Sequence, residues 1–228
     1  MLSEAQKTFR FAIIMCVCCS LALTAASVGL KERQDENKLI DRQKNILKAL
    51  NLIEKKQKYT GIQIKKTYND NVKEYYLDDQ GNLTKEETAR AVFIVGDIAN
   101  IKTYAVPFKA YGLWSWIYGY IALDGDGNSI VGFTVYSHAE TPGLGGECEK
   151  PWFQDQFIGK KITDINGKFV SIGVVKGKVS DKGFDKVKEK NYVDGMSGAT
   201  ITSKGIEDYL RKDLLVYELF SERLRRKG

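Results

Sequence analysis

The strongest constraint on this chain is a run of twenty uncharged, mostly apolar residues at positions 11–30. At about 1.5 Å per residue, a helix of this length spans about 30 Å, which matches the hydrocarbon core of a bilayer. A cleavable signal peptide is the alternative, with Lys7 and Arg10 as its charged start and small residues at 24–26 as its exit. Because the run is longer than a usual signal core and passes directly into a charged segment, we predict one retained transmembrane helix.

The charges that flank this run do not fix its orientation. Two basic residues precede it, whereas five follow it within residues 31–44. Taken alone, the positive-inside rule would place the following segment in the cytoplasm, but long domains translocate largely regardless of flanking charge. Orientation therefore needs other information.

The rest of the chain has the composition of one globular domain. With 228 residues, of which 43% are hydrophobic, it can bury one sizeable core. The net charge of +6 comes from 35 basic and 29 acidic residues that are interleaved along the chain. No basic arm or stripe is present, so we predict no nucleic-acid partner.

The four cysteines indicate neither a disulfide framework nor a metal site. Cys16, Cys18 and Cys19 lie inside the apolar run, and Cys148 is the one cysteine elsewhere. Without further cysteines or paired histidines, the first three are interpreted as small apolar residues of a lipid-facing helix. We therefore predict no bound metal.

The hydrophobic periodicity predicts an α+β fold: an N-terminal transmembrane helix followed by one soluble domain with a twisted, largely antiparallel sheet flanked by helices. Residues 1–10 precede the span at 11–30, apolar residues at helical spacing predict a connecting helix at 31–58, and 59–228 form the domain. Runs rich in Tyr, Val and Ile predict the strands. These lie at residues 62–68, 91–95, 103–108, 114–123, 129–136 and 170–175. Two further helices are predicted at 151–159, with proline first, and at 203–223, with Ser or Thr as N-cap.

One metal-like pattern is rejected. Asp124, Asp126 and Asn128 have the spacing of the first ligands of a calcium loop. Ser129 stands where such a loop needs glycine, and Val135 stands where it needs a bidentate glutamate. A hairpin turn is predicted instead. The single histidine, His138, has no partner at metal or triad spacing and is predicted to be a surface residue beside the loop at 140–147.

The most informative segment runs Asp-Gly-Met-Ser-Gly-Ala-Thr-Ile-Thr at residues 194–202, directly before the last predicted helix. Small residues leave a hydroxyl exposed on a turn, where backbone N–H groups and the positive end of the helix dipole favour a phosphate. An ordinary helix cap explains the same residues, and without other information it is the favoured interpretation. The residues alone therefore do not establish a phosphate site.

The Ser-Gly-Ala-Thr sequence after Asp-Gly-Met resembles the flavinylation motif of the FMN-binding domain family. The resemblance implies that the Thr200 hydroxyl forms a phosphoester with FMN, installed by a flavin transferase that uses FAD as donor. Gly198 and Ala199 belong to the motif, and the hydroxyls of Ser197 and Thr202 are expected to hydrogen-bond the phosphate.

Two further stretches support the resemblance. The Glu-Thr-Pro-Gly-Leu-Gly-Gly-Glu loop at 140–147 is similar to the one that lies against the isoalloxazine ring in this family. Glycines allow close approach, so the resemblance places Glu140, Thr141, Leu144 and Gly145 at the ring. The Gly-Leu-Trp-Ser-Trp stretch at 112–116 places Trp114 near the flavin.

A weaker candidate is Lys176, in Val-Val-Lys-Gly, for pairing with the phosphate or the ring. Two features depart from the family pattern: Cys148 and the region between residues 55 and 90.

Within this family, the segment at 25–34 with residues 41–43, and the Gly-Leu-Trp-Ser-Trp stretch, resemble those of the C subunits of sodium-translocating NADH:quinone oxidoreductases. The related ferredoxin:NAD oxidoreductase complex is the near alternative. The resemblance implies an inner-membrane subunit with a cytoplasmic N-terminus and a periplasmic domain. It would relay electrons from an iron–sulfur centre in the membrane subunits of a six-subunit complex to the FMN of the B subunit, during ubiquinone reduction coupled to sodium export. A membrane-tethered scaffold without flavin is the competing class. A soluble flavoenzyme is disfavoured, since the chain shows no acid/base pair and no dinucleotide fingerprint.

Overall fold

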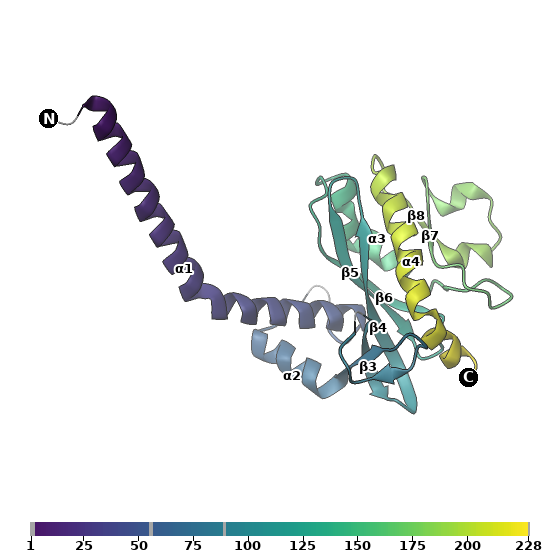
Figure 1. Ribbon diagram of the computed structural model, residues 1–228. Helices are drawn as coiled ribbons and strands as arrows, with labels where there is room; N and C mark the ends of the chain where they lie inside the picture. The colour runs from purple at the N-terminus through teal and green to yellow at the C-terminus, as the bar shows by residue number, and fades with distance from the viewer. Residues whose placement is uncertain (1–2, 55–56, 89, 228) are drawn as a thin grey trace. The chain divides into compact units, whose positions relative to one another are not determined.

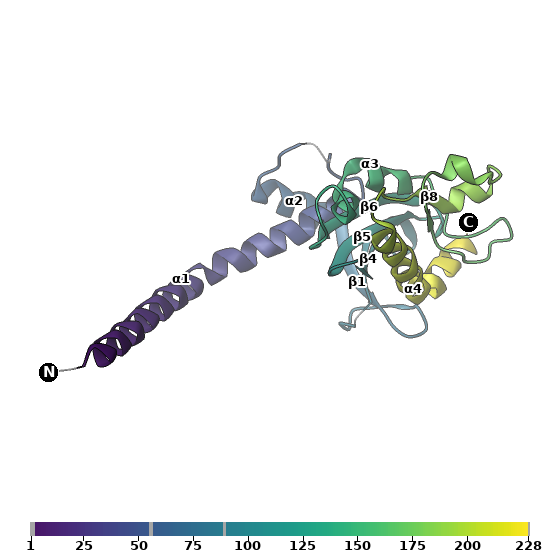
Figure 2. The same cartoon turned by 90° about the horizontal axis from the view of Figure 1, so that it is seen from above.

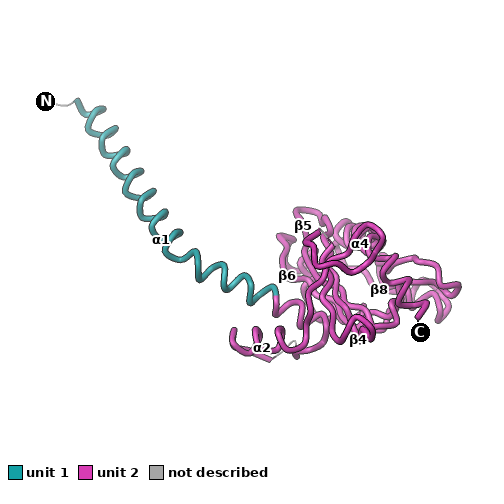
Figure 3. Tube along the Cα trace, turned by 60° about the horizontal axis from the view of Figure 1, so that its bottom comes forward, with its two compact units in different colours: residues 1–42 teal, residues 43–228 magenta. Residues whose placement is uncertain are grey.

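The computed structural model describes residues 3–54, 57–88 and 90–227. The chain divides into two compact units, Met1–Arg42 and Gln43–Gly228 (Figure 3). The first unit is helical and carries the apolar run. The second unit contains the sheet and the candidate site.

The first helix, α1 (Glu4–Ala49), contains the whole predicted span and its side chains at residues 11–30 are exposed. Among the described residues it is the one helix long and apolar enough to cross a membrane. The helix ends at Ala49, so the predicted continuation to residue 58 is wrong, although residues 55–56 lie outside the described part. Asn51 terminates it with a left-handed φ of 54°. The Leu52 N–H then bonds the Leu47 carbonyl at 2.9 Å, which is the Schellman pattern.

The second helix, α2 (Gly61–Asn71), replaces the strand predicted at residues 62–68, and that prediction is wrong. Thr60 and Gln63 form a reciprocal capping box at its start. Ile64 and Tyr68, four residues apart, are buried. The apolar run was therefore one face of a helix rather than a strand.

Six strands of the described chain form one antiparallel sheet in the order β2-β1-β3-β4-β5-β6. Strands β3 to β6 of this sheet are labelled in Figure 1. The fold class predicted from the sequence is thus confirmed. The strands are β1 (Val72–Leu77), β2 (Leu83–Thr84), β3 (Ala91–Asp97), β4 (Asn100–Tyr111), β5 (Trp116–Asp124) and β6 (Ile130–Ser137). The first two were not predicted. β5 begins at Trp116 rather than at 114, because residues 112–115 form the turn that joins it to β4, closed by a Gly112 N–H to Ser115 carbonyl bond of 2.9 Å.

The long helix α4 (Thr200–Arg225) lies along one face of this sheet (Figures 1 and 2). A Cβ added at Gly205 would lie 2.0 Å from the Tyr111 carbonyl oxygen, so glycine allows the helix to touch β4. On β6, a Cβ at Gly132 would lie 1.9 Å from the Ala49 carbonyl, which shows that the end of α1 meets the sheet equally closely.

A second, smaller sheet pairs β7 (Gly173–Val175) with β8 (Tyr192–Asp194) in parallel. The strand predicted at 170–175 is therefore shorter than expected and does not join the main sheet. Ser171 interrupts it with a φ of 66°. Short helices fill the connections: η1 (Gly145–Glu149), α3 (Pro151–Gln154), η2 (Asp155–Phe157), η3 (Val179–Lys182) and η4 (Lys188–Asn191). The predicted helix at 151–159 is thus one turn of α-helix followed by a 3₁₀ turn.

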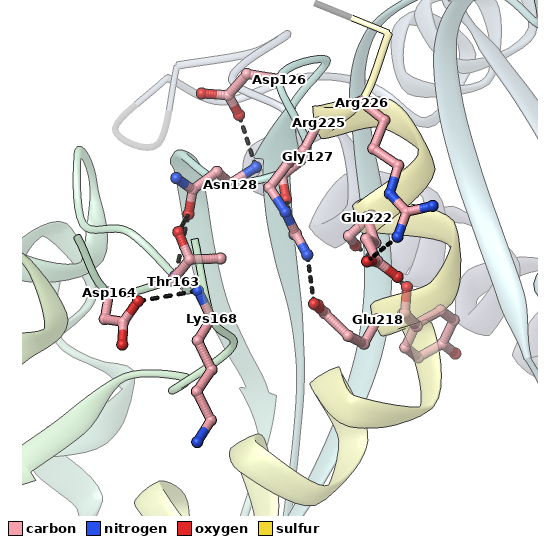
Figure 4. Close-up of polar contacts among 12 residues, drawn as sticks. Asp126, Gly127, Asn128, Thr163, Asp164, Lys168, Glu218, Glu222, Arg225 and Arg226 are labelled. Carbon is pink, nitrogen blue, oxygen red and sulfur yellow. Dashed lines mark hydrogen bonds and ion pairs between the residues drawn. The ribbon is translucent and has the colours of Figure 1, made fainter. Parts of the chain in front are cut away.

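The Asp126 segment is a hairpin turn, as predicted. The Asp126 carboxylate accepts the backbone N–H groups of Asn128 and Ser129 at 2.7 and 2.8 Å. Arg225 of α4 donates to the Gly127 carbonyl at 2.7 Å and also pairs with Glu218 (Figure 4). The turn is therefore fixed to the last part of α4.

Candidate functional site

The candidate site is built around the first residue of α4. The N-cap is Ala199, and no side chain of the described residues caps the helix there. The predicted Ser or Thr cap is wrong, and α4 begins three residues before its predicted start. The backbone N–H groups of its first turn are left for solvent or an anion, beside the exposed side chain of Thr200.

Ser203, which the sequence analysis did not single out, holds the turn before the helix. It is buried, and its hydroxyl accepts the Met196 N–H at 3.1 Å. Gly198 follows with a φ of 72°, which suits glycine. A Cβ there would lie 2.8 Å from Leu144 Cδ2, so the turn packs directly on the 140–147 loop. These contacts present Thr200 at the surface.

Thr200 lies where two cavities meet. The larger measures about 1150 Å³ and the smaller about 370 Å³, and both are lined by Thr200 and Gly198. Every residue predicted from the sequence lines at least one of them. Ser197 and Lys176 line the larger cavity, and Trp114, Glu140, Thr141, Leu144, Gly145, Ala199 and Thr202 line the smaller one.

Glu140 joins three segments beneath the smaller cavity. Its carboxylate accepts the backbone N–H groups of Leu113, Trp114 and Ser115 at 3.1, 2.9 and 3.3 Å, and the Thr202 hydroxyl at 2.6 Å. Burial alone would raise the pKa of Glu140, but these hydrogen bonds outweigh it and hold that pKa below its usual range. The carboxylate is thus ionised and occupied by protein donors.

Two predicted contacts differ from this arrangement. Glu140 is 4% exposed and Thr202 1% exposed, and the Thr202 proton is donated to Glu140 rather than directed to the turn. In this structure the Thr202 hydroxyl proton is therefore taken by Glu140, and Glu140 positions the surrounding loops. A Cβ at Gly145 would lie 2.5 Å from Glu140 Oε2, which explains the glycine beside this pair.

The apolar side chains around the smaller cavity are open to solvent. Trp114 is 66% exposed and Leu144 44% exposed. The larger cavity is bordered by four cations: Lys176, Lys178, Lys182 and Lys204. Apolar surfaces on one side of Thr200 and positive charge on the other suit a molecule with a flat ring and a phosphate. The residues present therefore fit FMN.

His138 lies beside the 140–147 loop, as predicted, but its side chain is largely buried rather than at the surface. Its side chain is 13% exposed, its Nε2 lies 3.4 Å from the Glu149 carboxylate, and its Nδ1 accepts the Glu140 N–H at 3.2 Å. His138 thus fixes the backbone at Glu140. Cys148 is fully buried beside this region, and burial, together with the negative charge of Glu140, raises the pKa of its thiol to about 12.

Comparison with known proteins agrees with this geometry. The FMN-binding domain family matches residues 112–214, a segment that contains both loops and Thr200. The C subunit of the Na(+)-translocating NADH-quinone reductase of Yersinia pestis is 32% identical, over 89% of this chain and 85% of that protein. The corresponding C subunit of Neisseria meningitidis serogroup A is 34% identical, over 83% and 81% of the two chains.

Solved structures give the same result. The crystal structure of the C subunit of the Na(+)-translocating NADH-quinone reductase from Parabacteroides distasonis has a TM-score of 0.71 at 32% identity, covering 84% of this chain and 96% of that one. Shewanella oneidensis NqrC has a TM-score of 0.66 at 26% identity, with coverage of 85% and 99%. Fold and site thus define a member of the FMN-binding domain class. The chain belongs to the family of C subunits of Na(+)-translocating NADH-quinone reductases.

Proposed function

We propose that this chain is the FMN-carrying subunit of a sodium-translocating NADH:quinone reductase, with FMN joined to Thr200 by a phosphoester. The observation that carries the proposal is the exposed Thr200 hydroxyl at an uncapped helix start, where the two cavities meet. A flavin transferase with FAD as donor would form the bond.

The residues around Thr200 have separate roles in holding the phosphate. The free N–H groups and the dipole of α4 stabilise its charge. The exposed hydroxyl of Ser197 can donate to it, and Lys176 adds positive charge from the wall of the larger cavity. The chain thus neutralises the phosphate mainly through backbone donors that need no side-chain movement.

The flavin ring is proposed to lie over the smaller cavity. Trp114 and Leu144 offer exposed apolar surfaces to it. Glu140 keeps the loops that carry these two side chains in place through its buried hydrogen bonds. Bound FMN would supply electron transfer, and the protein would set its orientation and surroundings.

The wider role follows from the relatives. The relatives are named as subunits of a Na(+)-translocating NADH-quinone reductase. This name favours membership of that complex over membership of the related ferredoxin:NAD oxidoreductase. In this assembly α1 anchors the chain in the bacterial inner membrane with its domain in the periplasm. The bound FMN passes electrons from an iron–sulfur centre of the membrane subunits to the FMN of the B subunit, and the complex reduces ubiquinone.

The test is made on the full chain, purified from cells that contain the transferase. We expect flavin fluorescence that remains with the protein band on an SDS gel. We also expect the intact mass of the chain to be increased by the mass of one FMN minus one water. Thr200→Ala should lose both signals, whereas Thr67→Ala, a threonine change in α2, should keep them. Flavin that dissociates from the wild type on denaturation would refute the covalent link. If the wild-type chain is colourless, and the complex that contains Thr200→Ala still transfers electrons, the chain would instead be a membrane-tethered scaffold without flavin.

A further inference from the structure

A second cavity, separate from the flavin site, lies at the opposite end of the small parallel sheet. The flavin-site cavity is lined by Val175 and Asp194, at the carboxyl ends of β7 and β8. The second cavity measures about 420 Å³ and is lined by Gly173 and Tyr192, at the amino ends. This volume is in the range of small-molecule pockets.

Ser171, on the wall of this cavity, breaks two general rules. It is a non-glycine residue with a φ of 66°, a strained conformation that persists where the surroundings enforce it. It is also 1% exposed, and within the described chain its hydroxyl has no hydrogen-bond partner. An unpaired buried hydroxyl is destabilising, so its retention beside a cavity points to a ligand.

The acidic side chains around the cavity are already engaged. Asp164 and Asp185 each accept two backbone N–H groups of their own turns, at 2.7 to 3.0 Å. Glu207 accepts the Val174 N–H at 3.2 Å and pairs with Lys204 at 2.9 Å. The three carboxylates thus stabilise the cavity wall itself.

The cations of the cavity are less constrained. Lys188 lies 4.5 Å from the centre of the Phe184 ring. Arg211, exposed on α4, has no carboxylate, carbonyl or ring partner among the described residues. Asn191 also lines the cavity, but its amide already donates to the carbonyls of Lys161 and Thr163. Most of the remaining wall is apolar, with Ile165 77% exposed and Val187 43% exposed. An apolar pocket with one available guanidinium favours an anionic group on an apolar body.

We propose that this cavity binds a small amphipathic carboxylate. The carboxylate pairs with Arg211 and accepts the Ser171 hydroxyl proton, and the apolar body lies against Val170, Ile172 and Val187. The site does not depend on the flavin assignment, because it shares no lining residue with the cavities at Thr200. Arg211 lies about 16 Å along α4 from Thr200 at the helical rise.

Phenylacetate and its neutral analogue 2-phenylethanol are the probes. Binding is measured by isothermal titration calorimetry on the full flavin-loaded chain in nanodiscs, with empty nanodiscs as the blank. We expect phenylacetate to bind at least tenfold more tightly than 2-phenylethanol. Arg211→Gln should weaken phenylacetate at least tenfold, whereas the adjacent Lys212→Gln, which is outside the cavity, should change it less than twofold.

Ser171→Gly separates a ligand contact from a structural role. Glycine adopts a φ of 66° without strain and leaves no hydroxyl unpaired, so the variant should melt at the wild-type temperature or above it. Its affinity for phenylacetate should nevertheless fall about tenfold to a hundredfold, as expected for a lost hydrogen bond to a charged group. Equal binding of the two probes, no binding of phenylacetate at millimolar concentration, or unchanged affinity in Arg211→Gln would overturn the proposal. None of these results bears on flavin attachment, which is read from the mass.

Discussion

Replacing Glu140 by glutamine tests whether its carboxylate holds the site together. The carboxylate accepts four hydrogen bonds, two on each oxygen, from residues 113–115 and from Thr202. An amide has one accepting oxygen, so in either orientation its NH₂ group faces at least one backbone N–H. A lost hydrogen bond to a charged group costs about 1.5–3 kcal/mol. We expect Glu140→Gln to lower the free energy of unfolding by about 3 kcal/mol, which for a domain of this size lowers Tm by about 6–12 °C.

The measurement is thermal unfolding of the full chain in detergent, followed by circular dichroism, with Glu87→Gln as the matched control. Glu87 is exposed, and its side chain has no partner in the described chain, so its variant should melt within about 2 °C of the wild type.

The pH dependence gives a second readout of the same carboxylate. The folded-state pKa of Glu140 lies below 4.5. The contribution of its carboxylate to the free energy of unfolding is therefore fully present above pH 4.5 and is lost as the pH falls through the folded pKa. The difference in melting temperature between wild type and Glu140→Gln should therefore narrow below pH 4.5. Equal melting temperatures at pH 7, or a difference that widens on acidification, would refute this account.

Two further predictions concern packing. Gly205→Ala should destabilise the domain by about 1–3 kcal/mol despite alanine's higher helix propensity, because its Cβ would lie 2.0 Å from the Tyr111 carbonyl; the free energy of unfolding in urea, with the exposed Lys212→Ala as control, measures this. Cys148, whose thiol is fully buried with its pKa raised to about 12, should resist iodoacetamide at pH 8 in the native chain and react after unfolding, as peptide mass spectrometry would show; native alkylation would contradict the buried position.

The residues predicted for the site lie together around two cavities, whereas several predicted element bounds are wrong. The turn at 194–200 and the loop at 140–147 are recognisable because their small residues are contiguous in the chain. The contact between Glu140 and Thr202 joins residues 62 positions apart, so no local pattern reveals it. The same holds for the parallel pairing of β7 with β8, which depends on the chain between them.

Two errors had a visible local cause. The strand predicted at 62–68 ignored the Thr60 and Gln63 capping box, a signal of helix initiation written in the sequence. The helix predicted to residue 58 ignored Asn51, one of the few residues other than glycine that readily adopt the left-handed conformation. In both cases, the prediction followed the spacing of apolar residues and neglected the residues that begin or end a helix.

Another error, the predicted Ser or Thr N-cap where the structure has Ala199, has a different meaning. Sequence rules favour Ser, Thr, Asp or Asn as N-cap, and alanine there costs about 1 kcal/mol. Thr202 and Ser203 lie nearby, but their hydroxyls have other hydrogen-bond partners. The Thr202 hydroxyl donates to the Glu140 carboxylate, and the Ser203 hydroxyl accepts the Met196 N–H. The start of α4 thus stays uncapped while the neighbouring hydroxyls hold the surrounding loops. Local rules are most often broken where another requirement prevails, and an anion at Thr200 would supply the missing cap. The absent side-chain cap is therefore an argument for the phosphate that is independent of the sequence motif.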